Sequence, residues 1–101
     1  MATLSKALFR GAATTSTGTT LYTVPASTST VISNIVVTNT GAAAYTFTMA
    51  FAGTAFATTT AIAANSIATF DIKQVLTATQ TITGGASNTA VNFHISGVEI
   101  S

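Results

Sequence analysis

The amino-acid sequence predicts an all-β domain, with its strands arranged as a sandwich or a barrel. Helix-forming residues are scarce, and no interior window holds apolar residues at a sustained helical spacing. Thr, Val, Ile and Phe instead alternate with small or polar residues in short runs between turn signals. A chain of 101 residues is the size of one domain, and since it contains no cysteine its fold must rest on packing alone.

Two segments show the strand pattern most clearly. Residues 45–51 place three aromatic side chains and a methionine on one face, with Thr and Ala on the other. Residues 91–96 repeat this alternation, with apolar side chains on one face and His94 on the other. The alternation slips at Gly97, which is typical of a bulge near a strand end. We expect both segments to be strands with one face in the core.

Turn signals divide the rest of the chain. Pro25 ends one strand, and tight turns are expected at residues 39–41, 52–53 and 64–65. The run 84–88 indicates a looser connection, and residues 73–76 are expected to form a single helical turn between two sheets. The other predicted strands are 19–24, 30–39, 55–62, 66–73 and 78–83, with 3–10 as a candidate first strand. The total is therefore seven or eight strands.

The segment 30–39 differs from the others because apolar side chains fall on both of its faces. These residues are Val31, Ile32, Ile35, Val36 and Val37. We interpret the segment as a central strand, or as a strand whose outer face is covered by another copy of the chain. Ile32 and Val36 are the candidate residues for this inter-copy contact.

The charge content is the most unusual feature of the composition. Only 5% of residues are charged, against about 25% in a typical protein. Such a surface has little electrostatic repulsion between copies, so we expect a homo-oligomer or a larger assembly. Three scattered cations are too few for the phosphate contacts of a nucleic-acid-binding protein. No apolar run approaches the roughly 20 residues that cross a membrane. We therefore expect neither a nucleic acid nor a membrane as a partner.

The beginning of the chain has two interpretations. Residues 1–11 carry Lys6 and Arg10, and the run 14–20 that follows contains only Thr, Ser and Gly. The segment 1–11 is either the first strand of a single domain spanning 1–101 or an extended arm on a flexible link. It holds no apolar run of signal-peptide length, so we expect no export by that route. If the terminal strands are neighbours, Glu99 is expected to pair with Lys6 or Arg10.

Residues that could carry catalysis are almost absent. His94 is the only histidine, and Asp71 and Glu99 are the only carboxylates. A triad of a serine, His94 and Asp71 can be written, but nine serines make such a combination expected by chance. We therefore predict a non-enzymatic protein without cofactor or metal. Asp71 and Lys73 are expected to form a weak surface pair.

Two binding functions stay open beside this prediction. Residues 77–83 place Thr at every second position, as on an ice-binding face, but no repeat of fixed period accompanies them. Glycan binding usually needs exposed aromatic platforms, and the chain has no Trp. Tyr22 and Tyr45 are expected to lie mainly in the core with their hydroxyls at the rim. Sugar binding by a small adhesion module would then depend on Tyr22.

Four segments taken in order carry a resemblance to a known group of proteins. They are 20–26 (TLYTVPA), 31–41 (VISNIVVTNTG), 62–66 (IAANS) and 95–100 (ISGVEI). Together they resemble small virion structural proteins of tailed bacteriophages over most of residues 19–101. One departure is Ser27, where such proteins often have Gly. The resemblance implies an immunoglobulin-like antiparallel β-sandwich and no catalytic residues.

The resemblance also implies a place in the virus particle. We expect a capsid decoration protein, made in the host cytoplasm, that binds the major capsid protein on the outer surface of the head as a small symmetric oligomer. Lys6 and Arg10 are the candidate capsid contacts, facing acidic residues of the shell. A tail, collar or fibre component is the alternative within the same class, and a carbohydrate-binding adhesion module is the alternative from another class.

Overall fold

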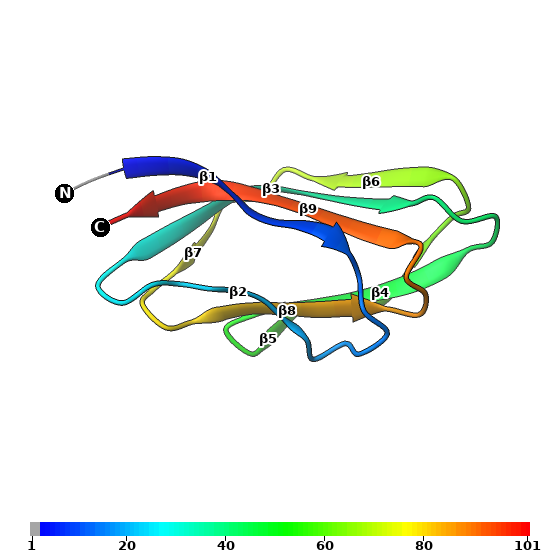
Figure 1. Cartoon of the computed structure of the whole chain (residues 1–101), viewed down its shortest axis with the longest axis horizontal. Coiled ribbons are helices and arrows are strands. Elements are labelled where there is room, and N and C mark those ends of the chain that lie inside the picture. Colours follow the sequence, from blue (N-terminus) through cyan, green and yellow to red (C-terminus); the bar gives the residue numbers. More distant parts are fainter. Residues whose placement is uncertain (1–2) are drawn as a thin grey trace.

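The predicted antiparallel β-sandwich is confirmed by the computed structural model, which describes residues 3–101 (Figure 1). Nine strands are present in these residues, where the sequence predicted seven or eight. In chain order they are β1 Thr3–Ala12, β2 Thr20–Thr23, β3 Ser29–Asn39, β4 Tyr45–Phe51, β5 Thr54–Ile62, β6 Ser66–Phe70, β7 Gln74–Leu76, β8 Thr81–Ala86 and β9 Val91–Ile100.

The strands form two antiparallel sheets. Sheet A has the order β1-β9-β3-β6, with the short β7 also pairing with β3, and sheet B has the order β2-β8-β4-β5. This alternation of sequential strands between two sheets is the jelly-roll order, which occurs in viral capsid and lectin domains. An immunoglobulin-like order would pair the first two strands within one sheet. Here β1 pairs with β9 and β2 pairs with β8, so the strand order differs from the one that the resemblance implies.

The core lies between the two sheets and follows the alternation read from the sequence. Strand β4 turns Phe47, Met49 and Phe51 inward, and β9 turns Phe93 and Ile95 inward, so both strand predictions are confirmed. The rings of Phe47 and Phe93 meet edge to face with centroids 6.2 Å apart. Each such buried side chain stabilises the fold by about 1.5–3 kcal/mol.

Two connections predicted from the sequence are strands instead. The expected helical turn at 73–76 is replaced by β7, which pairs with residues 30–32 of β3. Gly84 and Gly85 belong to β8 rather than to a loop. A Cβ on Gly85 would lie 2.2 Å from the carbonyl oxygen of Ser16. Gly85 therefore permits the backbone near Ser16 to approach β8 closely. The sequence predicts a turn at these glycines, and the structure has a strand there.

The irregularity expected at Gly97 lies on the two strands beside it. Strand β1 has one extra residue at Leu8, and β3 has one extra residue at Ser33, while β9 continues regularly between them. Gly97 faces inward, and a Cβ there would lie 2.4 Å from the carbonyl oxygen of Val31 and 2.9 Å from Cδ1 of Leu8. The glycine thus permits the close approach of the β3 backbone beside its bulge and leaves room for the inward-turned Leu8.

The amino-terminal segment lies along the edge of sheet A. Thr3 is opposite Ile100 in the pairing of β1 with β9, so the two ends of the chain lie at the same end of the molecule (Figure 1). Residues 1–2 of the segment 1–11 are outside the described residues. Strand β1 is therefore an edge strand, and its free edge faces away from β9.

Candidate functional site

The two cations predicted to contact a capsid lie on opposite faces of β1. Lys6 is opposite Gly97, and Arg10 is opposite His94. Because the extra residue Leu8 lies between them, the alternation reverses, so Lys6 points into the end of the sandwich and Arg10 points outward. The two side chains therefore cannot contact the same flat surface of a partner.

Of the two residues predicted to contact another copy, only Val36 reaches the surface. Ile32 is 0% exposed, because the bulge that follows it in β3 turns Ile32 inward on the same face as Ile35. The prediction of an inter-copy contact through Ile32 is therefore wrong. Val36 is half-buried on the outer face of sheet A, between His94 of β9 and Thr69 of β6.

Apolar side chains remain exposed on the outer face of sheet A. Val98, Val31 and Val75 form a row across β9, β3 and β7. Val75 is 65% exposed, and Ile67 on β6 is 69% exposed. Leu4 on β1 is the third exposed large hydrophobic residue within 3–101, but it is opposite Glu99, on the inward side of sheet A. Ile67 is opposite Thr38 and Val75 is opposite Val31, so the outer face carries two separate exposed apolar positions at different ends of β3.

The outer face of sheet B carries hydroxyl and methyl groups without charge. All five charged residues lie on strands of sheet A or in the loop that joins its strands β6 and β7. The outward residues of β4 and β8 include Thr46, Thr48, Ala50, Thr81 and Thr83. We call this surface the neutral face. It can be buried against a partner without the cost of desolvating a charge.

A polar cluster of Tyr22, Thr30, Glu99 and Lys6 joins the two sheets at the end where the chain termini lie. The Tyr22 hydroxyl, from sheet B, donates a hydrogen bond to the Glu99 carboxylate of β9. It also lies 2.9 Å from the hydroxyl of Thr30, which is 0% exposed. Lys6 Nζ is 3.5 Å from the same Glu99 oxygen, so the predicted pairing of Glu99 is made with Lys6.

The surroundings of Tyr22 favour its neutral form. Burial of the phenol raises the pKa of Tyr22 above its ordinary value, and the hydrogen bond to the negative Glu99 raises it further. The sequence indicated the pair of Glu99 with Lys6 but not the link to Tyr22, because only the jelly-roll order brings β2 beneath the end of β9. The cluster acts as a structural latch between the sheets.

His94 and the remaining charged side chains lie on the outer face of sheet A or in the loop before β7. His94 is half-buried on the outer face of sheet A, as predicted, and its cross-strand neighbours are Arg10 and Val36. The predicted pair of Asp71 and Lys73 is confirmed at 3.9 Å, but both side chains are exposed, so it contributes little stability. No group of three His, Cys, Asp or Glu within residues 3–101 is placed to hold a metal ion. No helix in this part of the chain is long and apolar enough to cross a membrane.

The structure also tests the two alternative binding surfaces. Tyr22 is only 9% exposed and its hydroxyl is bonded within the polar cluster, so it offers no platform for a sugar ring. Thr77 and Thr79 precede β8, and Thr79 has a positive φ of 70°. The threonines of 77–83 therefore do not form one regular strand face, and the pattern typical of ice binding is not realised.

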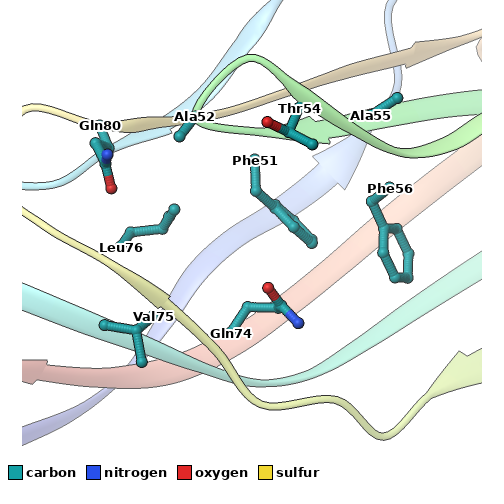
Figure 2. Close-up of a pocket in the computed structure, with 9 residues that line it drawn as sticks. All are labelled: Phe51, Ala52, Thr54, Ala55, Phe56, Gln74, Val75, Leu76 and Gln80. Atoms are coloured by element: carbon teal, nitrogen blue, oxygen red, sulfur yellow. The ribbon is translucent and has the colours of Figure 1, made fainter.

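A groove of about 490 Å³ opens on the side of the sandwich where the edges of β5 and β7 face each other. Figure 2 shows side chains of the β4–β5 hairpin on one side of it and side chains of β7 on the other. The residues that define its chemistry are Phe51, Thr54, Phe56, Gln74, Leu76 and Gln80. All are uncharged. The groove could not be predicted from the sequence, because its two sides come from separate sheets.

Comparison with known proteins gives only distant similarities. No protein-family model matches the chain, and no curated protein matches it. Two solved structures of a pentameric capsid protein isolated from metagenomic phage sequences are similar, at 16% identity with a TM-score of 0.39 and at 15% identity with a TM-score of 0.34. Each comparison covers 96% of this chain, but 57% and 59% of the respective capsid protein. The chain thus spans less than two thirds of their length.

Proposed function

We propose that the chain is a non-enzymatic structural protein of a bacteriophage particle, and that it decorates the outer surface of the head. The jelly-roll strand order is one that viral capsid domains use. The sparse charge supports a role in an assembly, because close packing of many copies then desolvates few ionised groups. The resemblance of the four sequence segments to virion proteins of tailed phages supports the same role.

The single observation that carries the proposal is the exposed apolar surface on the outer face of sheet A. Val75 and Ile67 remain more than half exposed there, at 65% and 69%. Arg10 points outward on the same face and provides the cation for an acidic residue of the shell. Lys6 is turned inward to Glu99, so we assign the capsid contact to Arg10 and the apolar residues.

The neutral face of sheet B is then available for contacts between copies in a small symmetric oligomer. Its Thr and Ala side chains can pack against an identical surface without bringing like charges together. A protein that binds the assembled shell better than free subunits stabilises the shell by mass action. Decoration therefore requires no active site.

A binding assay with two matched charge substitutions tests the contact face. Heads produced without the protein are mixed with purified wild type, Ile67→Lys or Thr48→Lys, and bound protein is measured after sedimentation. A lysine in a desolvated interface costs several kcal/mol, and ~3 kcal/mol corresponds to about a 100-fold loss of affinity. Ile67→Lys should lose binding by about this factor. Thr48→Lys lies on the face assigned to contacts between copies, so it should weaken self-association in sedimentation velocity, while each copy still binds heads through sheet A with a smaller loss than Ile67→Lys.

Ile67 is exposed, so Ile67→Lys should melt near wild type. Thr48→Lys loses the hydrogen bond that the Thr59 backbone N–H donates to the Thr48 hydroxyl, so it should lose about 0.5–1.5 kcal/mol of stability and unfold at a lower temperature. Binding is measured well below that temperature. If Thr48→Lys abolished binding and Ile67→Lys did not, the contact would lie on sheet B. Binding of wild type to purified tails but not to heads would replace decoration by a tail or fibre role.

A further inference from the structure

The groove between the β4–β5 hairpin and β7 combines an aromatic wall with neutral polar groups. The rings of Phe51 and Phe56 are adjacent, with centroids 5.1 Å apart and planes inclined by 36°. Phe56 also meets Phe70 edge to face at 5.4 Å, which holds its ring against the core. The aromatic wall is therefore fixed before any ligand arrives, which reduces the entropy lost on binding.

Three polar side chains, Gln74, Gln80 and Thr54, line the groove together with this wall. Gln80 Oε1 accepts a hydrogen bond from the backbone N–H of Thr77 at 2.8 Å, which fixes the side chain and leaves its NH₂ group as a donor. Figure 2 shows the Gln74 amide pointing from β7 into the groove, across from Thr54. Amides and hydroxyls in such a place both donate and accept hydrogen bonds.

The chemistry of the lining defines the ligand. Phe51 is only 8% exposed and Leu76 only 2%, so the aromatic surface on offer is the half-buried ring of Phe56, with Val75 at the rim. One accessible ring beside amides suits a ligand with an apolar face and a polar edge. A pyranose ring has this character, because its C–H face packs on an aromatic ring while its hydroxyls bond to amides. The lining contains no charged residue, so an anionic sugar would be buried without a counter-charge. The volume of about 490 Å³ lies in the usual range for small-molecule sites.

We infer that this groove binds a short neutral saccharide, held between Phe56 and the amides of Gln74 and Gln80. The site lies at the open edge between the sheets, away from the neutral face of sheet B, and it adjoins the outer face of sheet A at Val75. A decorated particle would then carry many copies of a weak sugar site on its surface. Many weak sites together can hold a particle to a glycan-coated cell.

The test is a titration of the ¹⁵N-labelled chain with neutral glucose-, galactose-, mannose- and N-acetylglucosamine-containing disaccharides, and with sialyllactose as the anionic contrast. At least one neutral disaccharide should shift the side-chain amide signals of Gln74 and Gln80, with a dissociation constant in the millimolar range. Gln74→Ala should weaken that binding at least tenfold, and Thr69→Ala, a control on the outer face of sheet A, should leave it within twofold.

Gln74 is exposed, so its substitution is not expected to impair folding, and Phe56→Leu provides a second variant that keeps an apolar side chain while removing the ring. The inference is overturned if no neutral sugar moves the groove signals at tens of millimolar. It is also overturned if binding survives Gln74→Ala and Phe56→Leu, or if sialyllactose binds more tightly than the neutral sugars. Neither result affects the assay of head binding, because that assay changes Ile67 and Thr48, which do not line the groove.

Discussion

Replacing Tyr22 with Phe removes a single oxygen atom from the polar cluster that joins the two sheets. The lost hydrogen bond has an ionised acceptor, Glu99, and bonds of this kind contribute about 1.5–3 kcal/mol. The hydroxyl of Thr30 is fully buried and would lose its partner at 2.9 Å, at a cost of about 1–3 kcal/mol. Since Thr30 can reorient in part, we expect Tyr22→Phe to lower the free energy of unfolding by about 2–4 kcal/mol.

Urea denaturation followed by circular dichroism measures this change directly. The midpoint should fall while the slope with urea stays constant, because the substitution changes stability and not the surface exposed on unfolding. Tyr45→Phe is the matched control, and it should change the free energy of unfolding by less than about 0.5 kcal/mol because Tyr45 lies outside the cluster. A Tyr22→Phe protein as stable as the Tyr45→Phe protein would refute the role of the cluster as a latch.

Two further predictions follow from the same structure. Because the folded-state pKa of Tyr22 is raised, the unfolded chain loses this proton first as pH rises. The stability that comes from the neutral phenol is therefore complete below about pH 10 and is lost above it. The urea midpoints of wild type and Tyr22→Phe should then converge in alkaline solution. A difference between the two midpoints that stays the same at all pH values would contradict this. Gly85→Ala places a Cβ 2.2 Å from the carbonyl oxygen of Ser16 and should destabilise the fold by about 1–3 kcal/mol. Gly18→Ala has open space around it and should melt near wild type in calorimetry. Equal melting temperatures for the two variants would show that the loop around Ser16 moves to accommodate the added methyl group.

The local pattern of the sequence predicted most strands because burial on one face imposes a period of two. Strand β4 has the predicted bounds, and β9 begins at the predicted residue. Strand β7 was not predicted, since three residues are too few to show a period and its partner β3 is distant in the sequence. Gly84 and Gly85 were interpreted as turn residues, because a glycine that admits a neighbouring backbone and a glycine that permits a turn are identical in sequence.

The candidate surfaces depend on features that a strand pattern does not contain. One extra residue in β1 separates Lys6 from Arg10, and one in β3 buries Ile32, because a single bulge moves each following side chain to the other face. The pairing of Glu99 with Lys6 could be predicted from the expectation that the terminal strands are neighbours. The link to Tyr22 could not, because it depends on how one sheet is placed over the other.

Cryo-electron microscopy of purified particles would show directly whether this protein decorates the head. We expect density for the sandwich at regular positions on the head lattice, with the outer face of sheet A toward the shell and Ile67, Val75 and Arg10 at the contact. Density on the head with the neutral face of sheet B toward the shell would contradict the assigned contact. Density on the tail alone, or no density for this chain anywhere on the particle, would contradict decoration itself.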